Sequence, residues 1–190
     1  MSDPTISVVI VSRERPESLI WCLSGLDGLL YPAFEVVVVA CPAGCSAAEG
    51  AGYAERVKLI RYDEANIAAA RNLGIAAAAG EIVAFIDDDA VPEPTWLEHL
   101  AAPFGDGSVA AVGGFVRGRN GISFQWKARE VDDCGRATPI EVDESRVSQP
   151  QPAPGRAIKT EGTNMAVRRD VLAALGGFDT GFRFFWMRQI

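Results

Sequence analysis

Residues 66–94 read NIAAARNLGIAAAAGEIVAFIDDDAVPEP, and this stretch decides the fold. Its alanine-rich first part predicts a helix over 67–79, with Gly80 expected where the helix ends. Gly74 inside that helix indicates close packing on a sheet, because glycine weakens a helix by about 1 kcal/mol relative to alanine. A buried strand over 81–86 follows and runs directly into three consecutive aspartates.

The same alternation of strand and helix begins earlier in the chain. Apolar, β-branched runs at 6–11 and 34–40 predict strands that are buried on both faces, and 57–62 predicts a shorter strand. Apolar residues recur at helical spacing over 19–30, whereas the small residues of 41–52 predict a turn. Strands and helices at this spacing predict an α/β fold. We expect a Rossmann-like, mostly parallel sheet flanked by helices in three α/β/α layers.

The second half of the chain has shorter predicted elements. A helix is expected over 95–102 and another over 171–175, and strands are expected over 109–116 and 162–168. We expect 1–190 to form a single domain. Its two halves are residues 1–94 and residues 95–190, and the second half is expected to be incomplete because the chain stops just after an aromatic cluster.

Composition excludes several classes of protein. With 18 Lys and Arg residues against 25 Asp and Glu, the net charge is −7, so the attraction that non-specific nucleic-acid binding requires is missing. No apolar run is long enough to span a membrane, and the first residues do not resemble a signal peptide. The four cysteines are expected to be reduced thiols. We therefore expect a cytoplasmic protein with no transmembrane segment.

The strongest sign of a functional site is the triplet Asp87, Asp88 and Asp89 at the end of a buried strand. Adjacent carboxylates repel one another unless they are solvated or bound to a cation. Carboxylate oxygens select magnesium, manganese or calcium, and magnesium is usually held by one or two carboxylates together with substrate phosphates. Taken alone, the triplet leaves two interpretations open, a metal site and a hydrated acidic turn.

Three segments in order carry a resemblance to a known family. Residues 6–19 read ISVVIVSRERPESL, residues 66–94 contain the aspartate triplet, and residues 162–179 read GTNMAVRRDVLAALGGFD. Together they resemble the family 2 glycosyltransferases over nearly the whole chain. The resemblance implies a GT-A fold, a nucleotide diphosphate sugar as donor, and inverting displacement by an acceptor hydroxyl group.

The resemblance also implies roles for particular residues. Those implied to contact the nucleotide sugar are Val11, Ser12, Arg13, Arg71, Asp87 and Asp88. Asp89, with Asp87, would hold a manganese or magnesium ion that bridges the two phosphates of the donor. For two of these residues a second interpretation stays open: Arg71 as a solvated charge on a helix, and Arg13 as part of an ordinary charged loop.

Two departures from the family pattern stand out. An acidic residue usually follows the second strand, where it meets the nucleobase, but this chain has Cys41 there, so uridine, guanosine and thymidine all stay open. The family's catalytic Glu-Asp pair is expected eight or nine residues beyond Asp179, where this chain has Met187 and Arg188. The catalytic base is therefore unassigned. Asp179 is the remaining candidate, with fixing of the local turn as its alternative role.

Three functions follow from these observations. The first is a metal-dependent inverting glycosyltransferase, with a glycan, a lipid-linked molecule or a small molecule as acceptor. The second is a catalytically silent module that binds a nucleotide sugar. The third, a nucleotidyltransferase, is disfavoured because the first strand lacks a glycine-rich phosphate loop after it. An unfinished C-terminal edge would favour a homo-oligomer. A peripheral position at the inner face of the membrane is the alternative to a freely cytoplasmic one.

Overall fold

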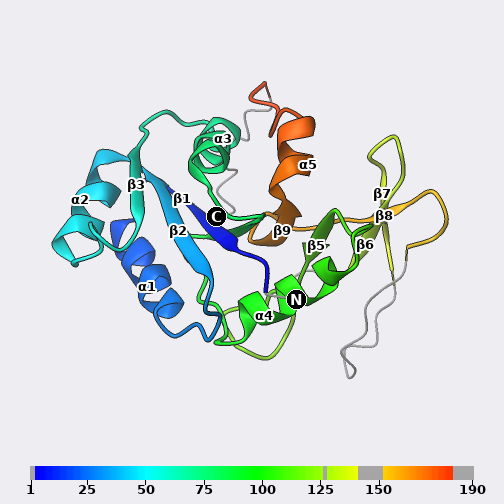
Figure 1. The fold of residues 1–190 in the computed structure, drawn as a ribbon, viewed down its shortest axis with the longest axis horizontal. Coiled ribbons are helices and arrows are strands. Elements are labelled where there is room, and N and C mark those ends of the chain that lie inside the picture. The colour runs from blue at the N-terminus through cyan, green and yellow to red at the C-terminus, as the bar shows by residue number, and fades with distance from the viewer. Residues whose placement is uncertain (1–2, 126–127, 141–151, 182–190) are drawn as a thin grey trace.

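The computed structural model describes residues 3–125, 128–140 and 152–181, which are built around one six-stranded sheet (Figure 1). The strands of this sheet are β1 (Ile6–Ser12), β2 (Phe34–Ala40), β3 (Lys58–Arg61), β4 (Ile82–Asp87), β5 (Ala111–Gly113) and β9 (Asn164–Arg168). Their order across the sheet is β3-β2-β1-β4-β9-β5. The first four are parallel, and β9 runs antiparallel between β4 and β5. The predicted mostly parallel sheet is confirmed.

Helices cover both faces of the sheet (Figure 1). Their bounds are α1 (Pro16–Leu26), α2 (Pro42–Gly50), α3 (Ile67–Ala77), α4 (Trp96–Ala101), the 3-10 helix η1 (Ala102–Gly105) and α5 (Arg169–Ala174). Buried residues of α1, α2, α4 and η1 pack on one face, and Leu172 of α5 together with partly buried residues of α3 packs with the other. This is the predicted three-layer α/β/α architecture. None of the helices in the described ranges combines the length and the apolar character needed to cross a membrane.

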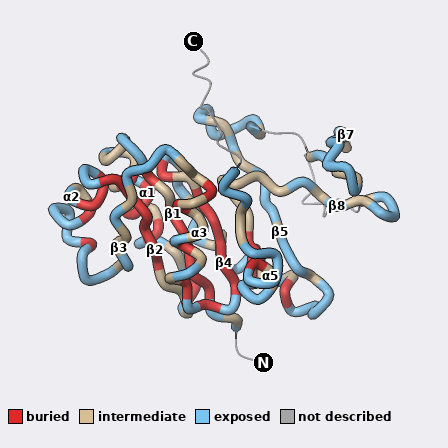
Figure 2. The backbone as a smooth tube through the Cα atoms, turned by 90° about the horizontal axis from the view of Figure 1, so that it is seen from above, coloured by how far each residue is buried: buried red, intermediate tan, exposed pale blue. Residues whose placement is uncertain are grey.

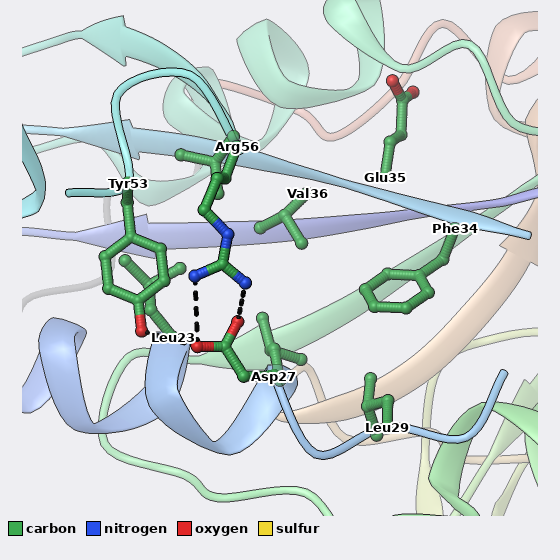
Figure 3. A pocket seen from close by; sticks show the side chains of 10 residues that line it. Leu23, Asp27, Leu29, Phe34, Glu35, Val36, Tyr53 and Arg56 are labelled. Carbon is green, nitrogen blue, oxygen red and sulfur yellow. Dashed lines mark hydrogen bonds and ion pairs between the residues drawn. The ribbon is translucent and has the colours of Figure 1, made fainter. Parts of the chain in front are cut away.

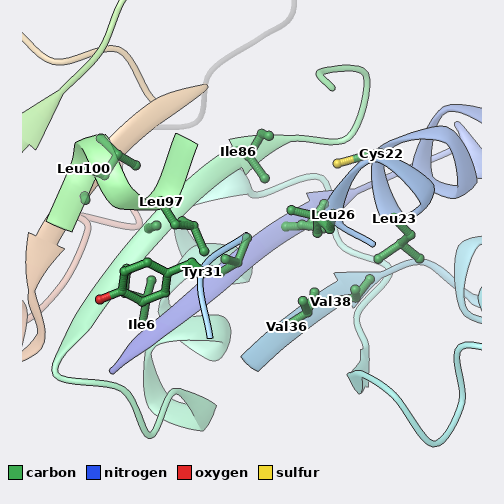
Figure 4. Packing of buried hydrophobic residues seen from close by; sticks show 14 of the residues in the cluster. Ile6, Cys22, Leu23, Leu26, Tyr31, Val36, Val38, Ile86, Leu97 and Leu100 are labelled. Carbon is green, nitrogen blue, oxygen red and sulfur yellow. The ribbon is translucent and has the colours of Figure 1, made fainter. Parts of the chain in front are cut away.

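Strand β1 lies between β2 and β4 in the sheet, and its residues alternate between the two packed faces. Ile6, Val8 and Ile10 belong to the same buried cluster as residues of α1 and α4, and Figure 4 labels Ile6, Leu23 and Leu97 among them. Val9 belongs to the opposite cluster. All four side chains are at most 1% exposed, which explains why the strand is apolar at successive positions.

A second, smaller sheet lies apart from this core. It consists of β6 (Arg129–Val131), β7 (Ala137–Pro139) and β8 (Ala157–Ile158), in the order β7-β6-β8. Figure 2 shows that its residues are mostly exposed, whereas the buried residues gather around the main sheet. The site is therefore expected on the main sheet, whose packed strands can hold side chains rigidly.

Two predictions about helices are wrong. Residues 41–52 were expected to turn, but Pro42–Gly50 form α2, with Pro42 in the first helical turn where proline is favoured. Helix α1 ends at Leu26 rather than reaching Leu30, which is 64% exposed. The sequence after Leu26 explains the early end, since Asp27 and Gly28 are poor helix formers.

The glycines of the α3–β4 region have different roles. Gly74 packs on the sheet as predicted, because a Cβ atom there would collide with the side chain of Val9. Gly80 was expected to end the helix, but the C-cap is Ala78. Gly80 instead approaches the sheet so closely that a Cβ atom would lie 2.6 Å from the backbone nitrogen of Ser7. Glycine is required at position 80 because there is no room for a side chain there, and not because of its φ angle.

Candidate active site

Polar residues gather where the parallel strands of the main sheet end. Register places Val11 of β1 beside Asp87 of β4, so Ser12 lies at the same edge. Because β9 is antiparallel to β4, its first residue, Asn164, pairs with Ile86 and also lies at this edge. Residues from both halves of the chain therefore meet at the carboxyl ends of the strands, where open α/β sheets bind ligands. We call this the acidic edge.

The three aspartates of the acidic edge lie in different environments. The side chain of Asp88 is completely buried, whereas those of Asp87 and Asp89 are 35% and 42% exposed. Asp87 and Asp89 are thus open to a ligand, and Asp88 has no exposed surface in this structure. The triplet separates into one buried carboxylate and two that solvent reaches.

The buried carboxylate is held by the loop after β1. Asp88 Oδ1 lies 2.8 Å from Nη2 of Arg15, and the hydroxyl group of Ser12 is adjacent. Burial raises the pKa of Asp88, and Ser12 and Arg15 oppose that rise by favouring the charged form. Neither Asp88 oxygen nor Ser12 Oγ has a well-aligned hydrogen bond among the described residues. The ion pair with Arg15 is therefore what offsets the buried charge of Asp88.

Asp87 faces the second half of the chain. Its Oδ1 lies 3.8 Å from Nη2 of Arg71, and the hydroxyl group of Thr163 is near its carboxylate and favours the charged form, which lowers the pKa. Burial raises the pKa of Asp87, with Arg71 acting against this. The backbone oxygen of Asp87 accepts a hydrogen bond from Sγ of Cys22 at 3.6 Å. Burial first, and then the nearby aspartates, raise the pKa of Cys22 to about 12, so it stays protonated as a donor.

Arg71 connects α3 to the segment before β9. Its side chain is 16% exposed, and Nη2 donates a hydrogen bond of 3.3 Å to the carbonyl oxygen of Gly162. Its guanidinium carbon lies 5.8 Å from the ring centre of Phe85 and 5.4 Å from that of Phe178. Arg71 is thus an interior cation between two aromatic rings, not a solvated charge on a helix.

The remaining predicted residues are more exposed. Arg13 is 43% exposed and pairs with its neighbour Glu14 at 3.3 Å, which agrees with an ordinary charged loop. Val11 lies partly buried in β1. Asp179 is exposed, and its Oδ1 accepts a hydrogen bond from the backbone nitrogen of Gly181 at 2.8 Å, so it shapes the local turn. Positions 187 and 188 lie outside the described residues.

The donor atoms of the acidic edge fit one mode of metal binding. The three aspartates do not form a cage, because their oxygens do not gather within 4.8 Å in the described structure. Asp89, with Asp87 near it, offers hard oxygen ligands that solvent reaches, which suits an ion that is completed by phosphates and water. A tighter cluster of Asp132, Asp133 and Cys134 does exist, but Asp132 also accepts backbone hydrogen bonds there as part of an exposed turn.

A separate cavity of about 230 Å³ lies away from the acidic edge (Figure 3). It is lined by the end of α1, the first residues of β2 and the segment that leads to β3. Asp27 and Arg56 form an ion pair beside it, and Tyr53 donates a hydrogen bond of 3.0 Å to Asp27. Since β2 starts at Phe34 in this cavity and ends at the acidic edge, the two lie at opposite ends of the sheet.

Sequence reasoning missed Arg15, Thr163 and Asn72 as parts of this site. Arg15 was passed over as one charge of a charged loop, yet it contacts both Asp88 and Asp89. Thr163 lies near Asp87, about 75 positions earlier in the chain. Asn72 contacts Phe178, 106 positions later. The pairing of β4 with β1 and β9 brings Arg15 and Thr163 to the aspartates, and the packing of α3 beside the segment after α5 brings Asn72 to Phe178. One sequence carries no signal for these contacts.

The chain matches the model of the family described as Glycosyl transferase family 2 over residues 7–176. The Pre-mycofactocin glycosyltransferase of Mycobacterium tuberculosis is 31% identical over 182 residues, which are 92% of this chain and 35% of that protein. The Glucosyl-dolichyl phosphate glucuronosyltransferase of Haloferax volcanii is 29% identical over 184 residues, which are 92% of this chain and 56% of that protein. This chain spans 35% to 56% of the length of such curated relatives.

Solved structures show the same fold. The mannosyltransferase PcManGT from Pyrobaculum calidifontis, in complex with GDP-Man and Mn²⁺, superposes with a TM-score of 0.67 at 24% identity. That match covers 95% of this chain and 49% of the other. S. aureus TarS 1–349 in complex with UDP-GlcNAc gives a TM-score of 0.62 at 18% identity, covering 90% of this chain and 47% of the other. The predicted GT-A fold is confirmed.

Proposed function

This chain belongs to glycosyl transferase family 2, and from that premise we propose that it transfers a sugar from a nucleotide diphosphate donor to an acceptor hydroxyl group. The observation that carries the proposal is the exposure of Asp87 and Asp89 at the carboxyl ends of the strands, beside the buried Asp88. A divalent ion at Asp89 would neutralise the charge that develops on the departing diphosphate. Without such an ion, this edge would repel the donor.

The chain's own residues prepare this edge for a donor. Arg71 and Thr163 both lie near Asp87, so its carboxylate has polar neighbours before anything binds. Asp89 is left as the carboxylate with the largest exposed fraction. We assign Asp89, with Asp87, to the metal, and we assign Asp87 also to the ribose side of the donor. Manganese or magnesium suits these oxygen ligands.

The nucleoside would lie over the end of β1. Val11, Ser12 and the exposed Arg13 are the residues assigned to it, as the family resemblance implies. Asp88 and Arg71 act from within the protein, since both side chains are largely or wholly buried.

Cys41 stands where an acidic residue usually meets the base, so the proposal covers uridine, guanosine and thymidine diphosphates alike. The related PcManGT structure, with GDP-Man and Mn²⁺, supports a nucleotide sugar with a divalent ion.

The acceptor would enter from the second half of the chain. In this proposal residues 1–94 bind the donor, and residues 95–190 carry the acceptor side. An inverting displacement requires a carboxylate base that takes the proton of the acceptor hydroxyl group. Asp179 contributes one oxygen to its own turn, and we assign no base among the described residues. The proposal covers three classes of acceptor: a glycan, a lipid-linked molecule and a small molecule.

A two-step experiment tests the proposal. Thermal shift of the purified chain is first measured with UDP, GDP and dTDP, each with and without Mn²⁺. At least one of them should raise the melting temperature more with the ion than without it, because a ligand stabilises only the state that it binds. Release of the diphosphate from the matching sugar donors is then measured. Stabilisation without any release of diphosphate would support a binding module instead. No stabilisation by any of the three nucleoside diphosphates would overturn both the transferase and the binding module.

A further inference from the structure

Arg15 contacts two of the three aspartates of the acidic edge. Its Nη2 lies 2.8 Å from Asp88 Oδ1, and its Nη1 lies 2.8 Å from Asp89 Oδ2. One planar guanidinium group therefore bridges two carboxylates through two different nitrogens, an arrangement that a lysine could not reproduce. Arg15 was absent from the residues expected to bind the donor.

The loop that carries Arg15 is fixed on both sides. Glu14 adopts a φ of 60°, a conformation that residues other than glycine rarely take, and its backbone nitrogen donates to Sγ of Cys41 at 3.4 Å. The carbonyl oxygen of Arg15 accepts a hydrogen bond from Leu19 at 3.1 Å in the first turn of α1. The side chain of Arg15 can therefore move while its backbone stays in place.

The two ion pairs of Arg15 differ in how easily they can be given up. Asp88 is completely buried, and a buried carboxylate that loses its partner is strongly destabilising. Asp89 is 42% exposed, and an exposed ion pair contributes little because water can replace the partner. Arg15 should thus keep Asp88 and release Asp89 when a stronger cation arrives.

We propose that Arg15 is a positioning residue that occupies Asp89 until a divalent ion displaces it. In the metal-free protein it offsets part of the negative charge of the acidic edge, and on metal binding the ion takes Asp89 while Arg15 stays on Asp88. This inference rests on the proposed function, because it requires Asp89 to be a metal ligand. Its consequence is that metal alone binds weakly, and the diphosphate is needed to complete the ion's ligands.

The test measures Mn²⁺ affinity by calorimetry at low salt, without nucleotide. Arg15→Met should bind Mn²⁺ about tenfold more tightly than the wild type, because a nearby positive charge and a competitor for Asp89 are both removed. Arg119→Met, at an exposed position that is assigned to no site, is the control. Loss of this exposed charge should change the affinity by no more than about twofold, as for a solvent-screened charge.

A second variant guards against misfolding. Arg15→Met leaves Asp88 buried without its partner, so the double variant Arg15→Met/Asp88→Asn removes both charges and keeps the net charge unchanged. It should also bind Mn²⁺ more tightly than the wild type. A merely structural role for Arg15, or a role for net charge alone, would leave this affinity unchanged.

The outcomes separate the two levels of the proposal. If the wild type binds Mn²⁺ and neither Arg15 variant binds it more tightly, the displacement is wrong while the metal site stands. If no variant binds Mn²⁺ even with each of the three nucleoside diphosphates present, the metal assignment of the proposed function is wrong, and this inference falls with it. Tighter binding in both Arg15 variants, with the affinity of Arg119→Met unchanged, supports the displacement.

Discussion

Asn72 and Phe178 hold each other by two reciprocal hydrogen bonds. Asn72 Nδ2 donates to the carbonyl oxygen of Phe178 at 2.8 Å, and the backbone nitrogen of Phe178 donates to Asn72 Oδ1 at 2.8 Å. The pair joins α3 to the turn that follows α5, 106 positions later in the chain. It keeps the ring of Phe178 beside Arg71 at the acidic edge.

Asn72→Ala should therefore lower the free energy of unfolding by about 1–3 kcal/mol, because it leaves partly buried backbone groups of Phe178 without their partner. Urea denaturation measures this as a lower midpoint at constant slope. Asn120→Ala is the control, since Asn120 bonds only within an exposed turn, and its effect should stay below about 0.5 kcal/mol. Equal effects of the two substitutions would show that the Asn72 contact does not join the two halves.

The long strands of the first half could be predicted because their composition leaves little choice. Phe34–Ala40 was predicted with the bounds that the structure has, since a run of valines between turn signals fits a buried strand. The helix over Pro42–Gly50 was missed because its small residues and its glycines carry almost no apolar stripe. There, packing of Cys45 and Ala48 on the core outweighs weak local propensity.

The site was predicted in part, for a physical reason. The aspartate triplet can be recognised from the sequence, because three adjacent carboxylates after a buried strand repel one another unless solvent or a cation compensates them. Arg15 pairs with both the buried Asp88 and the more exposed Asp89, which lie 73 and 74 positions after it in the chain. Pairings over such distances follow from the strand order and not from any local pattern, so one sequence cannot reveal them.

Two glycines in helices should respond oppositely to alanine. Gly74→Ala should destabilise the protein by about 1–3 kcal/mol, because the added Cβ atom would collide with Val9 in a packed layer. Gly50→Ala should stabilise it by about 0.4–1 kcal/mol, since nothing lies within 4 Å of the added atom and its φ is not in the left-handed region. Thermal unfolding of both variants checks this. Stabilisation by Gly74→Ala would contradict the close contact between α3 and β1.

Glu35 should make stability depend on pH in the acidic range. Partial burial acts to raise the pKa of Glu35, but hydrogen bonds from Lys58, Ser7 and the backbone of Ala79 lower it below its ordinary value of 4.5. A lowered pKa in the folded state means that the stabilisation is complete above about pH 4.5 and is lost as the pH falls through the folded-state pKa.

Replacing Glu35 should therefore flatten this part of the stability profile. The free energy of unfolding of Glu35→Gln, measured in urea from pH 6 to about pH 3, should fall less steeply than that of the wild type. Glu55→Gln, at an exposed position before β3, serves as the control and should keep the wild-type slope. A Glu35→Gln profile parallel to that of the wild type would show that these hydrogen bonds do not favour the charged carboxylate.

The most direct test of the central claim is the affinity of a nucleoside diphosphate measured by calorimetry, with and without Mn²⁺, for the wild type and for Asp89→Ala. The account predicts that Mn²⁺ tightens binding to the wild type by about tenfold or more, equivalent to at least about 1.4 kcal/mol, and that Asp89→Ala abolishes this gain. Asp133→Ala, in the exposed acidic turn, should keep it. Equal affinities with and without Mn²⁺ in the wild type, or a gain that survives in Asp89→Ala, would contradict the account.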